Sequence, residues 1–448
     1  MKQNIKVFVL PAIIIVFVLI TTFFPVYHPK VEVLSPPDMR YGLTENDISA
    51  MFGVKYSFVR YIFEPVLGPV EYVSQWRKIN IQLFTLFFWV LAVSVVIGII
   101  KSKKNSIFII CITALYFFVF IAFCVLFPSS ANRIVINSAK LKLVDIHSHT
   151  FQSHDGIRSF EYNNRWHKNM GFNEWYITEH EENNHTGNME LNLESNHYLF
   201  LQMGQLSVKD EEKFWLSNVP GKISMAHEHG GTVIVAEQWN DKNGKSPDIL
   251  AGYGVDGFEI VNGGFPYITK AEQQEIIDTC RKYKLTLWSS TDWHGWGNSY
   301  AYATAVDTPI PIGTKFTRVL PLCITRNESY SFTRLSLEPA SSIFYYFSGL
   351  NISQRISWIL WTLFFSVIFN LRVIKTCRKK FFVIFLNITL VVFLLFNSTV
   401  FAQAFLTEEM GGNKVIPLVF FMVTILAVIL GVYTLSLNKQ EKSSYGLK

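Results

Sequence analysis

Charged residues are scarce in this chain. Asp, Glu, Lys and Arg make up 17% of its 448 residues, whereas soluble globular domains usually carry about a quarter. Cysteine is scarce as well, because five cysteines are too few for a disulfide framework. Cys280 and Cys323 fall in the central polar region, where they either pair in an oxidising compartment or remain as buried free thiols. These shortages exclude a disulfide-stapled domain and favour a membrane protein.

Apolar residues, by contrast, are abundant. They make up 50% of the chain, with 39 Phe residues and a mean hydropathy of +0.25. The net charge of +6 does not indicate nucleic-acid binding, because Lys and Arg cluster beside the apolar runs, where they mark membrane topology. No nucleic-acid partner is therefore expected.

Six apolar runs are predicted to cross the plasma membrane as helices, three before and three after the central region. Five of them are uncharged and long enough for a bilayer core, which needs about 20 helical residues. The first also resembles a signal peptide, but no small-x-small cleavage site follows it, so an uncleaved anchor is favoured. The predicted spans are residues 7–27, 81–100, 107–127, 356–371, 381–401 and 415–435.

The distribution of Lys and Arg predicts the orientation of these spans. Basic residues crowd the N-terminus, the links 101–106 and 372–380, and the C-terminus. All four lie on one side if all six spans are real, and that side is expected to be cytoplasmic. Arg77, Lys78 and Arg355 lie next to spans on the outer side and are exceptions. The spans are interpreted as anchors, because five of them contain no charged residue that would indicate transport.

Three regions follow from this reading. Residues 1–127 form an N-terminal membrane region with three spans and an outer loop, to which no chemistry is assigned. Residues 128–340 form an extracytoplasmic domain, and residues 341–448 form a C-terminal membrane region with three spans. Both termini are predicted to be cytoplasmic in a multi-pass protein.

The central domain has the pattern of an α/β fold. Short apolar runs that end in polar residues alternate with helix-like segments, of which 271–283 is the clearest. Strands that alternate with helices predict a parallel sheet or barrel, in which functional residues collect at the carboxyl ends of the strands. The predicted strands are 141–146, 174–178, 198–203, 232–236, 257–261 and 285–288.

Histidines and carboxylates lie at these strand ends. In the run D-I-H-S-H, His147 and His149 point to the same face of an extended chain, so one metal ion can take both. Asp292 and His294 share a face in the same way, in the run T-D-W-H. A lone histidine is usually a surface or core residue, but two such pairs with a third motif between them predict a metal site. By contrast, His227 and His229 precede a Gly-Gly turn and are interpreted as the polar end of a helix.

The order of motifs D-x-H-x-H, S-x-D-G, T-[D/E]-H and D-x-H resembles the polymerase and histidinol phosphatase (PHP) family. The resemblance covers roughly residues 140–300; the combination is specific, although each fragment alone is weak. It implies a distorted (β/α)7 barrel of PHP type, here flanked by transmembrane helices. It also implies up to three divalent metals at the strand ends, and hydrolysis of phosphate esters by metal-activated water.

The resemblance also implies roles for individual residues. One metal would be held by His147, His149 and Asp292, which would carry the catalysis. A second metal would be held by Asp155, His180 and His294. Glu237 replaces a family histidine and can still bind a hard cation. The expected cofactors are two divalent metal ions, which are Zn, Mn, Fe or Mg.

The sequence departs from the family pattern at two other places. Gln205 stands where the family has a glutamate that bridges two metals. The histidine that the family has between Gln205 and Glu237 has no clear counterpart, and Lys213 and Trp215 stand near its position. These departures put a third metal in doubt. Glu179 replaces the usual Asp and is expected to keep its role of positioning the ligands.

Two functions from different classes follow. The first is a membrane-anchored phosphoesterase that acts on a phosphorylated envelope component, whether a small molecule, a glycan or a lipid. The alternative is a catalytically degenerate PHP-like module that binds a ligand or assembles a membrane complex, and Gln205 and the missing histidine favour it. An amidohydrolase-like activity is a third, more distant possibility.

Overall fold

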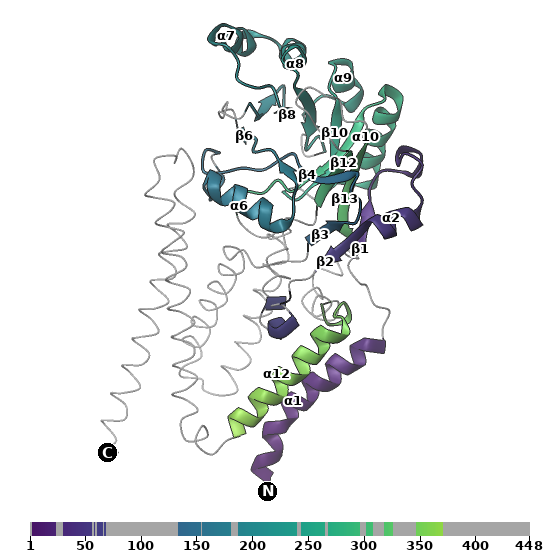
Figure 1. Cartoon of the computed structure of the whole chain (residues 1–448), viewed down its shortest axis with the longest axis vertical. Coiled ribbons are helices and arrows are strands. Elements are labelled where there is room, and N and C mark those ends of the chain that lie inside the picture. The colour runs from purple at the N-terminus through teal and green to yellow at the C-terminus, as the bar shows by residue number, and fades with distance from the viewer. Residues whose placement is uncertain are drawn as a thin grey trace, which may run out of the picture.

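The computed structural model describes residues 2–23, 30–55, 58, 61–65, 67–68, 133–153, 155–180, 187–239, 243–264, 268–295, 302–307, 318–325 and 346–370. Within these ranges the chain forms a mixed α/β domain and a pair of helices below it (Figure 1). The pair consists of α1 (Lys2–Ile20), which continues into η1 (Thr21–Phe23), and α12 (Ile352–Asn370).

Two sheets form the frame of the domain. The first has the strand order β1 (Lys30–Val33), β13 (Val319–Thr325), β12 (Tyr302–Asp307), β4 (Leu141–Asp145) and β5 (Glu174–Trp175). The second has the order β11 (Thr286–Ser290), β10 (Gly257–Asn262), β9 (Thr232–Ala236), β8 (Asn196–Leu201), β7 (Met189–Leu193) and β6 (Glu179–His180). A separate ribbon pairs β2 (Phe52–Lys55) with β3 (Arg133–Ile136).

The two sheets are joined beside the predicted site. A parallel bridge between Ser148 and Trp293 links the segments that follow β4 and β11. Residues 174–180 supply β5 to the first sheet and β6 to the second. The ends of strands from both sheets are therefore brought together.

The predicted α/β fold class is confirmed, whereas a closed (β/α)7 barrel is not observed among the described strands. Parallel pairs occur at β4–β5, β6–β7, β9–β10 and β10–β11. The pairs β7–β8, β8–β9, β4–β12, β12–β13 and β1–β13 are antiparallel. The β7–β8 hairpin turns at Glu194 and Ser195, both with positive φ, as a two-residue turn of the type I′ class requires.

The core lies on both faces of the sheets. Successive residues of β8 point to opposite faces, so Leu199 and Leu201 pack between the sheets while Tyr198 and Phe200 pack outward. The outer cluster is covered by α7 (Val208–Leu216), α8 (Val219–Glu228), α9 (Pro247–Gly252) and α10 (Lys270–Tyr283). A third cluster lies under α2 (Glu45–Met51) and α6 (Phe160–Met170). Cys280 and Cys323 are buried free thiols.

Part of the predicted outer loop packs on the domain. Strand β1 pairs antiparallel with β13, from Lys30 opposite Thr325 onward, and buries Val31 and Val33. Arg281 on α10 donates hydrogen bonds from Nε and Nη2 to the carboxylate of Asp38, at 2.6 and 2.9 Å. The structure therefore adds residues 30–55 to the domain predicted at 128–340.

The two helices below the domain run antiparallel (Figure 1). Arg355, near the start of α12, donates from Nη1 to the carbonyl of Val18 (2.7 Å) and to Thr21 Oγ1 (2.9 Å), at the end of α1. Predicted spans 7–27 and 356–371 overlap these helices, and the other four predicted spans lie outside the described residues. In the described ranges, no helix combines the length and the apolar character needed to cross a membrane.

Candidate metal centre

The predicted ligand pairs lie side by side where the two sheets meet. His147 and His149 follow β4, and Asp292 and His294 follow β11. The Ser148–Trp293 bridge sets the two runs in register, and the His149 amide donates to the Trp293 carbonyl at 2.8 Å. The four side chains therefore converge from two strands of different sheets.

The first group of potential ligands is fully buried. His147 Nε2 lies 3.0 Å from Glu190 Oε2, and His149 Nε2 lies 3.3 Å from the same oxygen. Asp292 Oδ1 lies 3.4 and 3.3 Å from these two nitrogens. The ligand atoms of His147, His149 and Glu190 all lie within 4.8 Å of one another.

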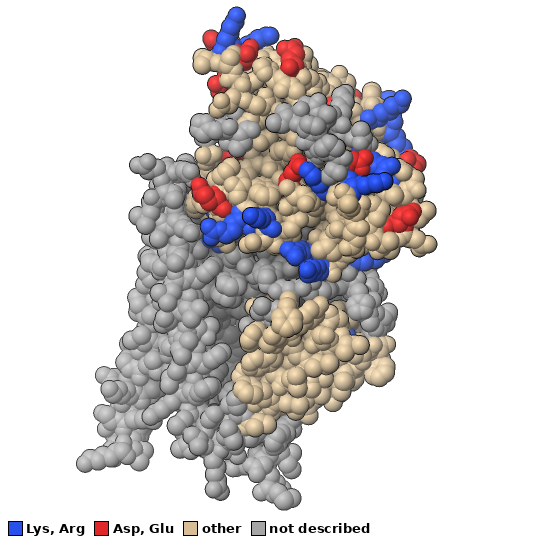
Figure 2. Space-filling view, in the orientation of Figure 1, with Lys and Arg blue, Asp and Glu red and all other residues tan. Residues whose placement is uncertain are grey.

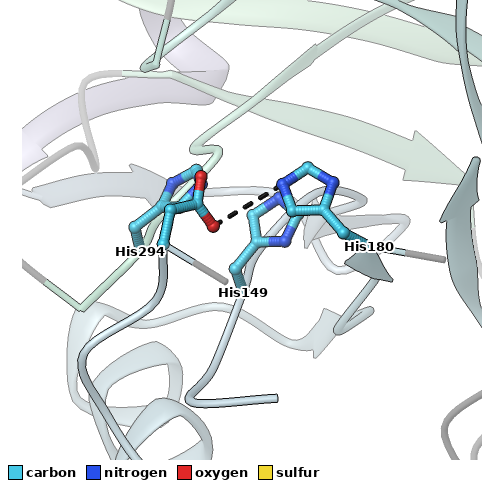
Figure 3. Close-up of side chains that lie close together, drawn as sticks. His149, His180 and His294 are labelled. Carbon is cyan, nitrogen blue, oxygen red and sulfur yellow. Dashed lines mark ion pairs between the residues drawn. The ribbon is translucent and has the colours of Figure 1, made fainter. Parts of the chain in front are cut away.

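The second group opens toward solvent and contains His149, His180 and His294, which converge in Figure 3. Its carboxylate is Asp155, which lies 2.8 Å from His294 Nε2 through Oδ2 and 3.6 Å from His180 Nε2 through Oδ1. The ligand atoms of these four residues again lie within 4.8 Å of one another. The residues predicted for each metal are thus brought together, and His149 belongs to both groups.

Glu190 joins the two groups, and the sequence did not reveal it. Its Oε2 also lies 3.3 Å from His180 Nδ1, so one oxygen contacts nitrogens of three histidines. The sequence contains no signal for it, because residues 189–193 alternate apolar and polar side chains and Glu190 takes a position that usually faces solvent. In the structure Met189, Glu190 and Leu191 are all buried. A buried carboxylate of this kind needs partners that stabilise its charge.

The interpretation of Gln205 as the replaced bridging residue is wrong. In the β8–β9 pair, His197 lies opposite Ala236 at the end of β9, whereas Leu201 lies opposite Thr232 at its start. Because Gln205 follows β8, it lies at the end of the sheet away from the histidines, and its side chain is exposed. Glu190, on the preceding strand, supplies the shared carboxylate instead.

Glu237 lies beside these groups with a histidine that the sequence also left unassigned. Glu237 Oε2 lies 3.6 Å from His197 Nδ1, and His197 Nδ1 lies 3.9 Å from Glu190 Oε1. Glu237 adopts a positive φ of 51° directly after β9, and its Oε1 accepts a hydrogen bond from Asn262 Nδ2 at 2.8 Å. His197 lies on β8, before Gln205 in the chain, and so outside the interval between Gln205 and Glu237 where the family resemblance led us to expect a histidine.

Hydrogen bonds behind the rings orient the ligating nitrogens. Ser153 Oγ donates to Glu179 at 2.6 Å, so it accepts from His149 Nδ1 at 2.9 Å. His147 Nδ1 donates to Glu259 Oε1 at 3.3 Å. Each of these hydrogen bonds fixes the ring so that its Nε2 faces the carboxylates. Histidines that bind metals are commonly oriented in this way, by a hydrogen bond from the other ring nitrogen.

Glu179 holds the loop that follows the first histidine pair. Its buried carboxylate accepts hydrogen bonds from the amides of Thr150 (3.1 Å) and Ser153 (3.0 Å) and from both of their hydroxyls. This geometry agrees with the positioning role predicted for Glu179. Since the loop leads to Asp155, Glu179 also helps to place that carboxylate.

The site favours positive charge. Burial alone would lower the pKa of His147 and His149, but nearby carboxylates outweigh it. Asp292 and Glu190 raise the pKa of His147 well above its usual value, and close contacts with the same two carboxylates raise the pKa of His149 to about 10. Burial likewise opposes ionisation of Glu190, yet His147 and His149 hold its pKa well below the usual range.

The residues present fit divalent cations. Buried His149 Nε2 lies 3.3 Å from oxygens of Glu190 and Asp292, and buried Asp155 Oδ1 lies 3.6 Å from His180 Nε2. Neither atom makes a hydrogen bond of good geometry with a described residue, although both point into the group of ligands. Imidazole nitrogens with carboxylate oxygens suit Zn, Fe or Mn, whereas Mg prefers the oxygens. A cation would complete the coordination of these atoms and balance the excess of carboxylates.

The remaining histidine pair lies elsewhere. His227 is in the last turn of α8 and lies 2.8 Å from Asp256 Oδ2, and His229 caps the helix. This agrees with the prediction that they form the polar end of a helix.

Comparisons with known proteins add little. Neither a protein-family model nor a curated protein matches the chain. Similar solved structures include a metal-dependent phosphoesterase of Bifidobacterium adolescentis (14% identity, 39% of this chain and 92% of that chain, TM-score 0.27). They also include PsfC of Pseudomonas syringae (14%, 46% and 98%, 0.31) and an amidohydrolase of Chromobacterium violaceum with bound sulfate and no metal (11%, 37% and 92%, 0.26). At these TM-scores the similarities support no argument, so the functional case rests on side-chain geometry.

Proposed function

We propose that the chain is a metal-dependent hydrolase of phosphate esters of PHP type. One observation supports this most strongly: Glu190 Oε2 lies within 3.3 Å of nitrogens from His147, His149 and His180. A carboxylate oxygen shared by two ligand groups is what a bridged pair of metals requires, and paired metals are a recurrent device for hydrolysing phosphate esters.

The chain's own residues would bind and orient the reacting groups. Divalent cations at these positions would neutralise the phosphate and lower the pKa of a bound water. His147, His149 and Asp292 lie deepest and would hold the first cation, with Glu190 shared. Asp155, His180 and His294 would hold the second, and Glu237 with His197 would contribute at the edge.

The open side of the site indicates where the substrate approaches. The side chains of Asp155 and His180 are 35% and 22% exposed, whereas those of His147 and His149 are almost fully buried. A phosphate group would therefore enter past Asp155, His180 and His294. We propose a phosphorylated small molecule, glycan or lipid of the cell envelope as the substrate, and no nucleic acid.

The proposed location is the plasma membrane, with the domain outside and both termini in the cytoplasm. The six apolar runs of the sequence and the placement of Lys and Arg beside them support this. Apolar side chains of α1 and α12 are also exposed, among them Val16, Leu360 and Val367.

The alternative is a degenerate binding or assembly module, which Gln205 and the unplaced histidine favoured. The positions of Glu190 and His197 beside the proposed ligands support the catalytic proposal instead. An amidohydrolase activity would use a similar metal centre, so substrate trials must include amides.

Glu190→Gln tests the proposal, because Gln keeps the shape of the side chain but loses the anionic oxygen. We expect the variant to bind fewer metals per chain and to hydrolyse bis(p-nitrophenyl) phosphate at least about 100-fold more slowly. The matched control is Gln205→Glu, which should leave metal content and rate unchanged because Gln205 is exposed. If the parent binds metal tightly but hydrolyses no phosphate ester, the binding module is the better account.

A further inference from the structure

A cluster of cations lies on the edge of the domain that faces the helix pair. Figure 2 shows Lys and Arg side chains over α6 and the β2–β3 ribbon on this edge. The cluster consists of Lys55, Arg133, Arg165 and Lys168, and all but the half-buried Arg133 are exposed. The proposed metal centre uses none of them.

The backbone places these cations close together. Lys55 and Arg133 are directly opposite each other in the β2–β3 pair. Arg133 Nη1 donates to the carbonyl of Asn169 at 3.1 Å, which brings it to the end of α6, where Lys168 lies in the last turn. Like charges directly opposite in a ribbon are destabilising, so this arrangement needs a compensating anion.

The domain itself supplies little compensation. The carbonyl end of α6 favours nearby cations, but no carboxylate among the described residues forms an ion pair with any of the four. Other surface cations do have such partners: Lys142 pairs with Glu174 at 2.6 Å and Lys282 with Asp248 at 2.9 Å. The cluster is therefore left with a net positive charge.

The position of the cluster indicates the missing anion. Lys55 ends β2 and Arg133 begins β3, so both lie where the chain leaves the domain toward the predicted spans 81–100 and 107–127. We propose that this cluster contacts the anionic headgroups of phospholipids in the membrane that holds the helices. The proposal rests on the membrane attachment proposed above.

Such a contact would fix the domain through α6. The buried face of the same helix reaches the metal centre: Asn163 Nδ2 donates to the His149 carbonyl at 3.0 Å, and His167 Nε2 lies 2.8 Å from Asp145 Oδ2. The headgroups would hold the outer face of α6, and its inner face contacts the segment that carries Asp145 and His149. The helix would therefore set the orientation of the site relative to the lipid surface.

Lysine labelling of the full chain in nanodiscs tests the contact. Nanodiscs of phosphatidylcholine alone are compared with nanodiscs of equal parts phosphatidylcholine and phosphatidylglycerol, with a water-soluble acylating reagent and mass spectrometry. In the anionic bilayer, labelling of Lys55 and Lys168 should fall about fivefold and recover at high salt. Lys209 and Lys213, exposed on α7 at the far end of the domain, should label equally in both.

Charge reversal supplies the matched variants. Arg133→Glu with Arg165→Glu should abolish the protection of Lys168, whereas Lys209→Glu with Lys213→Glu should preserve it. Equal labelling of Lys55 and Lys168 in the two bilayers would overturn the proposal. Failure of the chain to enter neutral nanodiscs would instead count against membrane attachment, and protection of the same lysines by added anionic vesicles would then decide the headgroup contact.

Discussion

At the scale of single residues, the site is defined by a few carboxylates that hold imidazoles in fixed positions. Glu190 contacts three histidines, and Asp292 Oδ1 lies within 3.4 Å of His147, His149 and His294. In the metal-free protein, protons on the rings balance these charges. Metal ions must displace those protons, so binding is coupled to pH.

Glu237 makes this coupling testable near neutral pH. Burial raises its pKa to about 7, so its carboxyl is protonated below that pH and must ionise before it can bind a metal. Metal affinity should therefore rise as the pH rises through about 7. The metal-induced increase in Tm should be larger well above pH 7 than well below it, and Glu237→Gln should reduce the difference. An increase that is equal on both sides would contradict the assignment of Glu237.

Most of the site could be predicted from motifs, because spaced pairs such as His147 with His149 show their common face in the sequence. Glu190 could not be predicted, since its strand has no motif and its two deepest partners, His147 and His149, are about 40 residues away along the chain. Gln205 was misassigned because the sequence does not show that β8 runs antiparallel to β9, which places the carboxyl end of β8 away from the histidines.

At the scale of elements, the loop after β4 depends on one buried carboxylate. Glu179→Ala would leave the amide of Thr150 and the hydroxyls of Thr150 and Ser153 without the carboxylate that accepts from them, and unsatisfied buried donors cost about 1–3 kcal/mol each. We expect the free energy of unfolding, followed by tryptophan fluorescence in urea, to fall by about 3 kcal/mol. The control Glu161→Ala lies at an exposed position and should change it by no more than about 0.5 kcal/mol. A small effect of Glu179→Ala would show that the loop is held by other contacts.

Strand β1 is a second such element, although it precedes the domain in sequence by about 100 residues. Val33 lies on β1 and is only 4% exposed where β1 pairs with β13. Val33→Ala should therefore lower the free energy of unfolding by roughly 2 kcal/mol. Lys30→Ala, at the exposed start of the strand, should have little effect. A chain that begins at residue 128 would leave the edge of β13 unpaired, and we expect it to aggregate. A stable, monomeric product would contradict this.

Local elements were predictable, whereas their pairing was not. Residues 232–236 and 271–283 were expected as a strand and a helix, and they appear as β9 and α10. Thr269 and Glu272 form a capping box at the start of α10, a local signal that the sequence shows. The β7–β8 hairpin was missed because Glu194 and Ser195 are not the Asn-Gly or Asp-Gly pair that usually marks such a turn. Antiparallel pairing of β4 with β12 depends on tertiary contacts.

At the scale of the whole molecule, the order of the elements along the chain limits how the domain can be oriented relative to the proposed membrane. The end of α1 and the start of α12 both lie toward the domain, and β1 follows soon after α1. We predict that a cysteine introduced at exposed Glu212 on α7 reacts with a membrane-impermeant thiol reagent in intact cells. A cysteine in the basic run 372–380 should react only after lysis. Cys280 and Cys323 are buried and should stay unreactive in the folded protein. The reverse pattern would invert the proposed orientation.

The central claim is that the histidine and carboxylate groups form a metal centre that hydrolyses phosphate esters. Metal analysis of the purified full chain, combined with an assay of phosphodiester hydrolysis after loading with Mn or Zn, tests it most directly. We predict at least two metals per chain and measurable hydrolysis. His149→Ala should lose both, because His149 belongs to both ligand groups, and His227→Ala should retain both. A chain that binds no metal, or a His149→Ala variant with unchanged metal content and rate, would contradict the account.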